Sequence, residues 1–164
     1  MTNDAILAKI REAFPTAVVD VPEGMMDFTV VLAADQLFDV AKLLHDEIGM
    51  DYLTDVTAVD YPDHFEVVYH LYSIDQSLGL LTLKVLLADK ASPAVASVTP
   101  IWPGANLMER EVYDLMGIDF PGHPDLRRIM LWDGFPGHPL RKDFENRTFT
   151  FVELEPTRPK PPNW

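Results

Sequence analysis

The apolar periodicity of this chain of 164 residues stops at Gly117, and this change limits its possible folds more than any other feature. Before Gly117, short apolar runs alternate with turn residues. Residues 118–164 instead hold eight of the fourteen prolines. Because proline fixes φ and removes a backbone donor, such a stretch favours extended backbone that needs a surface to lie on. We therefore predict a compact domain over 1–117 and an extended partner-binding strap, rich in Pro and Arg, over 118–164.

The compact part has the pattern of an α/β domain of the α+β type, with a mixed sheet packed by two to three helices. Apolar residues at helical spacing predict three helices. The first is expected to be capped by Asn3 or Asp4 and to end at Pro15. The second is expected to be capped by Asp35 and to end before Gly49, and the third covers 106–116.

Strands are indicated by short runs rich in β-branched and aromatic residues between turn residues. Phe65, Val67, Tyr69 and Leu71 alternate with more polar neighbours, as in a sheet with one buried face. The strands are expected at 17–21, 28–32, 52–61, 65–73, 78–87 and 95–99.

The third helix combines an apolar face with a charged side. A charged side of this kind is predicted to be solvated or to meet a partner, since residues two apart in a helix do not face each other as an acid/base pair would. The charged residues are Glu109, Arg110, Glu111 and Asp114.

The net charge of −13 is unevenly distributed. Residues 1–108 hold 16 acidic and 5 basic side chains, a net −11, whereas 109–164 hold 10 and 8, a net −2. An acidic body argues against nucleic acid or anionic lipid as the main partner. Arg127, Arg128 and Arg141 are predicted to bind carboxylates, either of the third helix or of a neighbouring protein.

Several classes of protein are disfavoured by composition. The chain has no cysteine, which excludes disulfides, thiolate catalysis and cysteine ligation of zinc or iron–sulfur clusters. No apolar run approaches the roughly 20 residues that span a bilayer. The first residues lack a basic region followed by an apolar one, so we expect no secretory signal and a cytoplasmic protein.

Two enzymatic interpretations stay open at this point. His123 and His138, with Asp125 and Asp143 nearby, offer ligands for a metal or an acid/base site, although their spacing matches no compact metal motif. Arg127–Arg128 and Arg141–Lys142 offer cations for a phosphate, but no Gly-rich strand-to-helix loop accompanies them. The proline after each histidine is more simply explained by ordered turns.

Two long motifs carry a resemblance to a known family. The run EREVYDLMGIDFPGHPDLRRI over 109–129 and the run GHPLRKDF over 137–144 closely resemble the signatures of the C subunit of the proton-pumping NADH:quinone oxidoreductase, respiratory complex I. The segments DYP at 60–62 and FEVVYHL at 65–71 also fit that family. The resemblance covers essentially the whole domain and is of the unfused bacterial type.

The resemblance implies a scaffold subunit of the hydrophilic arm that has no catalytic site of its own. FMN, iron–sulfur clusters and quinone would be bound by partner subunits, with no cofactor or metal in this chain. The implied partner is chiefly the large quinone-site subunit, in a hetero-oligomer peripheral to the cytoplasmic face of the bacterial plasma membrane, with no nucleic acid and no membrane span. The equivalent subunit of a membrane-bound hydrogenase-like complex is the alternative. The residues implied to contact partners are Glu109, Arg110, Glu111, Asp114, His123, Asp125, Arg127, Arg128, His138, Arg141, Lys142 and Asp143.

Overall fold

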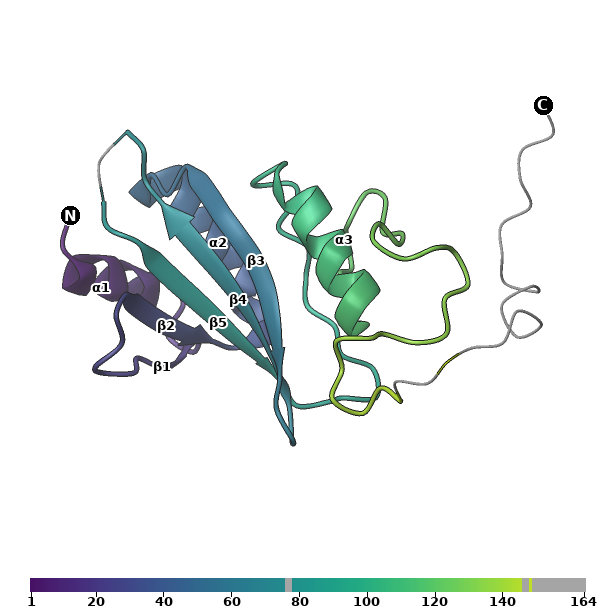
Figure 1. Ribbon diagram of the computed structural model, residues 1–164. Helices are drawn as coiled ribbons and strands as arrows, with labels where there is room; N and C mark the ends of the chain where they lie inside the picture. Colours follow the sequence, from purple (N-terminus) through teal and green to yellow (C-terminus); the bar gives the residue numbers. More distant parts are fainter. Residues whose placement is uncertain (76–77, 146–147, 149–164) are drawn as a thin grey trace, which may run out of the picture.

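The computed structural model describes residues 1–75, 78–145 and 148, and its centre is a five-stranded mixed sheet (Figure 1). The strand order is β1-β2-β5-β4-β3. Only β2 and β5 pair in parallel, while the other neighbours are antiparallel. The strands are β1 (Val18–Asp20), β2 (Phe28–Leu32), β3 (Tyr52–Asp60), β4 (Phe65–Tyr72) and β5 (Leu81–Leu87). The predicted α+β class with a mixed sheet is therefore confirmed.

One face of the sheet packs against helices, and α2 lies behind the strands in the view of Figure 1. The alternation predicted in β4 is confirmed, since Phe65, Val67, Tyr69 and Leu71 are all buried in this core. Fully burying one such side chain contributes about 1.5–3 kcal/mol. The helical segments are α1 (Asn3–Ala13), the 3₁₀ turn η1 (Ala34–Gln36), α2 (Leu37–Leu43), the π turn η2 (Leu44–Ile48) and α3 (Ala105–Met116).

The opposite face of the sheet bears no helix among the described residues. Val59, Glu66 and Leu86 lie in one cross-strand row on this outer face. Glu66 also forms an ion pair with Lys84, 2.8 Å between Oε1 and Nζ. An antiparallel sheet tolerates one solvated face of this mixed kind.

Helix α3 lies beside the edge strand β3 and joins the same core through Ala105, Val112 and Met116 (Figure 1). The indole of Trp102, just before α3, donates to the carbonyl of Met50 at 3.1 Å. An edge strand with a long row of unpaired backbone groups is a site of unwanted pairing, and a neighbouring helix reduces that exposure.

The start of each N-terminal helix differs from the prediction. Thr2, not Asn3 or Asp4, caps α1, because its hydroxyl accepts the amide of Ala5 at 3.3 Å. Asp35 lies inside η1 and makes no cap hydrogen bond there. The end of the second helical segment is confirmed, since Gly49 adopts the left-handed conformation that a C-terminal glycine permits.

The predicted strand at 95–99 is wrong. This segment forms a single parallel bridge between Ala94 and Asp119 and does not join the sheet. The amide of Val95 donates to the carbonyl of Asp119 at 3.0 Å, and the amide of Ser97 donates to Pro121 at 2.9 Å. The segment therefore binds the beginning of the strap instead of a strand.

The beginning of the strap is part of the core. Ile118 and Phe120 are both buried within the hydrophobic cluster of the domain. The surface on which residues 118–145 lie thus includes the chain's own α3 and the end of its sheet (Figure 1). The boundary at residue 117 stays a prediction, and residues 149–164 of the strap lie outside the described residues.

Candidate interaction site

Helix α3 directs three charged side chains into the protein. Glu109 and Asp114 are 0% exposed and Arg110 is 7% exposed, while Glu111 lies on the surface. The charged side was predicted to be solvated or to meet a partner, and the solvated alternative is wrong for these three residues, which are buried within the chain. Buried charges persist only where they are paired and hydrogen-bonded, so their partners define the site.

Asp114 binds the strap through both carboxylate oxygens. Its Oδ2 accepts three consecutive backbone amides, those of Ile129 at 3.0 Å and of Met130 and Leu131 at 2.8 Å. Its Oδ1 accepts Nη1 of Arg128 at 2.8 Å. Burial raises the pKa of Asp114, but the amide and guanidinium hydrogen bonds outweigh burial and hold that pKa below its ordinary value.

Arg128 closes a loop of the strap. Its guanidinium donates to the carbonyl of Phe135 at 3.1 Å and to that of Gly137 at 3.1–3.2 Å. The same side chain is bound to Asp114, so one residue joins both ends of the segment 128–137 to α3. We call residues 128–137 the stapled loop.

Arg110 binds the backbone at the start of the stapled loop. Its Nε donates to the carbonyl of Arg127 at 3.1 Å, and its Nη2 donates to that of Arg128 at 3.2 Å. Two guanidinium groups on and beside α3 therefore satisfy four strap carbonyls, including those of Phe135 and Gly137. Irregular backbone that lies against a domain needs such partners for its polar groups.

Glu109 fixes the segment before α3. Its carboxyl accepts the amide of Val98 at 2.7 Å and the hydroxyls of Ser97 at 2.6 Å and Thr99 at 3.1 Å. Burial raises the pKa of Glu109, and these hydrogen bonds offset only part of that effect. The buried hydroxyl of Tyr69 has no hydrogen-bond partner among the described residues, and burial together with the Glu109 charge raises its pKa.

The two histidines of the Gly-His-Pro steps have different environments. His123 Nε2 donates to the carbonyl of Asn106 at 3.1 Å, because its Nδ1 accepts the amide of Asp125 at 2.9 Å. His138 Nδ1 donates to the carbonyl of Asp114 at 2.9 Å. A Cβ at Gly117 would lie 2.5 Å from the His138 ring, so the ring fits against α3 only because residue 117 is glycine.

A second junction joins the strap to the end of β3. The buried carboxylate of Asp60 accepts the amide of Lys142 at 2.8 Å and forms an ion pair with Lys90. Burial raises the pKa of Asp60, but the hydrogen bonds from Lys90 and Lys142 lower it below the ordinary value. Arg141 Nη2 donates to the carbonyl of Lys90 at 2.6 Å, and its guanidinium lies 4.9 Å from the ring centroid of Phe65.

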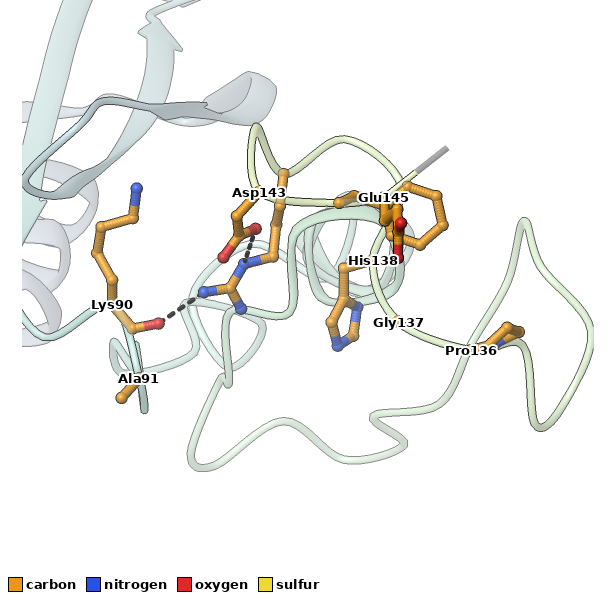
Figure 2. Close-up of a pocket in the computed structure, with 9 residues that line it drawn as sticks. Lys90, Ala91, Pro136, Gly137, His138, Asp143 and Glu145 are labelled. Carbon is orange, nitrogen blue, oxygen red and sulfur yellow. Dashed lines mark hydrogen bonds and ion pairs between the residues drawn. The ribbon is translucent and has the colours of Figure 1, made fainter. Parts of the chain in front are cut away.

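Figure 2 shows the open hollow of about 560 Å³ beside this junction. Arg141 lines the hollow, donates to the carbonyl of Lys90 and lies 3.5 Å from the carboxylate of Asp143. His138 also lines it (Figure 2). Phe144 and Glu145 also line the hollow.

The structure brings together only part of the predicted set. The predicted pairing of Arg128 with a carboxylate of the third helix is confirmed by Asp114. Arg127 and Arg141 instead pair with strap carboxylates, those of Asp125 at 2.8 Å and Asp143 at 3.5 Å. All of the residues implied to contact partners except Glu111 thus have polar contacts within the chain, and the role of the whole set toward a partner stays a prediction.

The four residues proposed for a metal or acid/base site do not come together in the structure. His123 contacts Asp125 only through the backbone amide, His138 binds the carbonyl of Asp114, and the carboxylates of Asp125 and Asp143 pair with arginines. The described residues contain no cluster of three His, Cys, Asp or Glu placed to hold a metal. Sequence reasoning missed Asp60, Lys90 and Ser97 as anchors. The available signal was Asp60 in the DYP segment, a carboxylate at the end of an apolar strand.

Comparison with known proteins agrees with this arrangement. Residues 30–150 match the family described as respiratory-chain NADH dehydrogenase, 30 kDa subunit. The C subunit of the NADH-quinone oxidoreductase of Moorella thermoacetica is 45% identical over 147 residues, 88% of this chain and 97% of that protein. The same subunit of Geobacter sulfurreducens is 42% identical over 146 residues, 87% of this chain and 89% of that protein.

A solved structure is similar in fold. A chain of the membrane-bound sulfane sulfur reductase, an archaeal respiratory membrane complex, superposes with a TM-score of 0.69 at 26% identity. The match covers 87% of this chain and 85% of that chain.

The fold and the sequence thus define a subunit of the type found in multi-subunit respiratory complexes. This chain belongs to the family of the 30 kDa subunit of respiratory-chain NADH dehydrogenase. Among residues 1–75, 78–145 and 148, no helix combines the length and apolar character needed to cross a membrane.

Proposed function

We propose that this chain acts as the C subunit of an NADH-quinone oxidoreductase, the enzyme that transfers electrons from NADH to quinone. The observation that carries the proposal is the 40–45% identity to proteins of that name over most of the chain. The whole complex is the enzyme, and this chain contributes to its assembly without a catalytic site of its own.

The proposed role is that of a cofactor-free scaffold in the hydrophilic arm. FMN, iron–sulfur clusters and quinone would be bound by other subunits, and their electron transfer would be coupled to proton translocation. The absence of cysteine from all 164 residues supports this role, because iron–sulfur clusters are held by cysteine thiolates. The buried charged residues of α3 support it too, since Glu109, Arg110 and Asp114 each bind backbone groups of this chain.

We further propose that the strap docks against the large quinone-site subunit, at the cytoplasmic face of the membrane. The strap is anchored to its own domain at two points, Asp114 and Asp60. A segment held at two points presents a fixed surface, and a fixed surface loses less conformational freedom when it binds.

Gentle purification tests the proposal. The chain is tagged in its native host, membranes are solubilised in mild detergent, and the captured proteins are identified. We expect stoichiometric subunits of an NADH-quinone oxidoreductase, with NADH-dependent quinone reduction in the captured material and none in the separated chain. Capture of the chain alone, or activity in the separated chain, would contradict the proposal.

A second candidate function is that of the equivalent subunit in a hydrogenase-like membrane complex. The 26% identity and TM-score of 0.69 of the archaeal chain show that this fold also occurs outside NADH-quinone oxidoreductases. The same purification separates the two candidates, because subunits of a hydrogenase-like complex would replace the NADH-oxidising subunits in the captured material.

A further inference from the structure

The stapled loop directs the guanidinium of Arg128 toward its own domain and leaves large apolar side chains exposed. Arg128 is bound to Asp114 and to strap carbonyls, whereas Ile129, Met130 and Trp132 are 38%, 63% and 41% exposed. Three exposed large apolar side chains therefore lie within the four residues 129–132. Exposed large apolar groups on a fixed segment mark an interaction surface.

The stapled loop is bound to its own domain at both ends. Asp114 binds the amides of Ile129, Met130 and Leu131 at its start, and Arg128 binds the carbonyls at its end. The Trp132 ring packs edge-on against Phe135, with 4.8 Å between centroids. Restraint of the free loop lowers the entropy lost on association.

We propose that the stapled loop is an apolar anchor, by which Met130 and Trp132 insert into an uncharged apolar recess of a neighbouring protein subunit. This inference rests on the proposed function, in which the strap docks against another subunit. It adds that the apolar loop, and not the arginine cluster, supplies most of the binding energy. Asp114 is then a positioning residue that acts through the loop backbone.

The charges around the loop favour a protein recess as its binding partner. Within 129–137 the only ionisable side chain is Asp133, in a chain whose net charge is −13. The adjacent cations are neutralised, Arg128 by Asp114 and Arg127 by Asp125. Complementarity to the uncharged side chains of Met130 and Trp132 therefore favours an apolar surface, because buried charge without a partner is costly. An anionic lipid surface is disfavoured, since it attracts free Lys and Arg.

Trp and Met are suited to this role. Interface hot spots are enriched in Trp, lie in desolvated pockets and account for most of the affinity. Met130 adapts its shape to an irregular recess because it is unbranched. Both side chains protrude from the loop, so their truncation changes the surface and leaves the staple of Asp114 and Arg128 in place.

The outer face of the sheet offers matched controls. Val59 is 38% exposed and Leu86 is 43% exposed, close to the values of Ile129 and Trp132. In one cross-strand row these two side chains flank Glu66, which is bound to Lys84, so the outer face is broken by charge. If any loss of exposed apolar area reduced partner binding, truncation of Val59 and Leu86 would reduce it as much as truncation of the loop residues.

The experiment compares two double variants with the wild type. Tagged chains replace the native copy, membranes are solubilised gently, and the partner subunits recovered per captured chain are measured. We expect Met130→Ala/Trp132→Ala to lower recovery at least about tenfold, as loss of a hot spot does. We expect Val59→Ala/Leu86→Ala to recover partners like the wild type. Circular dichroism of each purified chain should match the wild type.

Three outcomes would overturn the inference while the proposed function stands. One is normal recovery with the loop variant, and another is a loss with the sheet variant alone. The third is flotation of the wild-type chain, but not of the loop variant, with vesicles of anionic phospholipid, which would assign the loop to a membrane surface. Failure of the wild-type chain to recover any partner would instead contradict the proposed function.

The chain's own residues 149–164 are a further occupant to test. A chain that ends at residue 148 should recover partners at a level that still depends on Met130 and Trp132. If that truncation alone abolished protection of Trp132 from acrylamide quenching in the isolated chain, the C-terminal segment would be the occupant and the inference would be wrong.

Discussion

Asp114 and Arg128 form an ion pair of 2.8 Å in which each partner binds a different end of the same loop. The carboxylate binds the amides that follow Arg128, and the guanidinium binds the carbonyls of Phe135 and Gly137. The side chain of Asp114 is 0% exposed and that of Arg128 is 17% exposed. Because both are largely removed from water, the pair couples the stapled loop to α3 more strongly than a surface ion pair would.

Truncation of Asp114 should be among the most destabilising changes in the chain. Asp114→Ala leaves the guanidinium of Arg128 and three loop amides without their acceptor, at a cost of about 3–5 kcal/mol. Chemical denaturation of the purified chain measures this loss. The control is Glu111→Ala, on the exposed side of the same helix, which should change stability by at most about 0.5 kcal/mol. Equal effects of the two variants would contradict the role of Asp114.

Stability should fall in acid because of Asp114 and Asp60. Both have folded-state pKa values below the ordinary value of about 3.9, so the native state binds fewer protons than the unfolded state. Their contribution is complete above about pH 3.9 and is lost as the pH falls through the folded pKa values. Unfolding of Asp114→Asn between pH 7 and pH 3 should show a smaller loss than the wild type. An unchanged acid slope would refute this assignment.

Glu109 should show the opposite pH dependence. Its folded pKa is raised, so the native state binds more protons than the unfolded state, and stability decreases as the pH rises from the ordinary value of about 4.3 through the folded pKa. Glu109→Gln should remove this decrease and match or exceed the wild type at pH 7. Glu109→Ala should cost about 1–3 kcal/mol, because the amide of Val98 loses its acceptor. Thermal unfolding across this pH range distinguishes the three proteins.

Gly117 should tolerate no side chain. Gly117→Ala incurs about 1–2 kcal/mol for its positive φ and also places a methyl group against the His138 ring. Gly24 has a similar φ and open space around it, so Gly24→Ala measures the backbone cost alone. We expect the Gly117 variant to be the less stable of the two, and His138→Ala to relieve part of the difference. Equal stability of the two glycine variants would show that the ring simply moves.

Much of the domain was predictable because its signals are local. The bounds of β2 agree with the predicted 28–32, and β4 begins at the predicted residue 65 and ends one residue before the predicted 73. The wrongly predicted strand at 95–99 shows where prediction from local signals fails. Its amides bind Asp119, Pro121 and the side chain of Glu109, and no local pattern reports such distant acceptors.

The sequence predicted which residues take part in the site better than it predicted how they are arranged. The sequence places Arg128 near a carboxylate of the third helix, and the structure confirms the pair with Asp114. It does not reveal that Asp114 faces inward, because a charged residue in an amphipathic helix normally faces solvent. The anchoring of the strap by Asp60 joins residues 82 positions apart, a relationship that only the tertiary fold creates.

The most direct test of the scaffold account is the assembly of Arg128→Ala in cells that lack the native copy. Removal of the guanidinium frees the end of the stapled loop, where Arg128 binds the carbonyls of Phe135 and Gly137, and should leave the sheet and its helices intact. Native gels should show a severalfold loss of the chain from the membrane complex, while the purified variant keeps the circular dichroism of the folded domain. Normal assembly combined with lost quinone reductase activity would contradict the account, because the segment would then act in the chemistry and not in the scaffold.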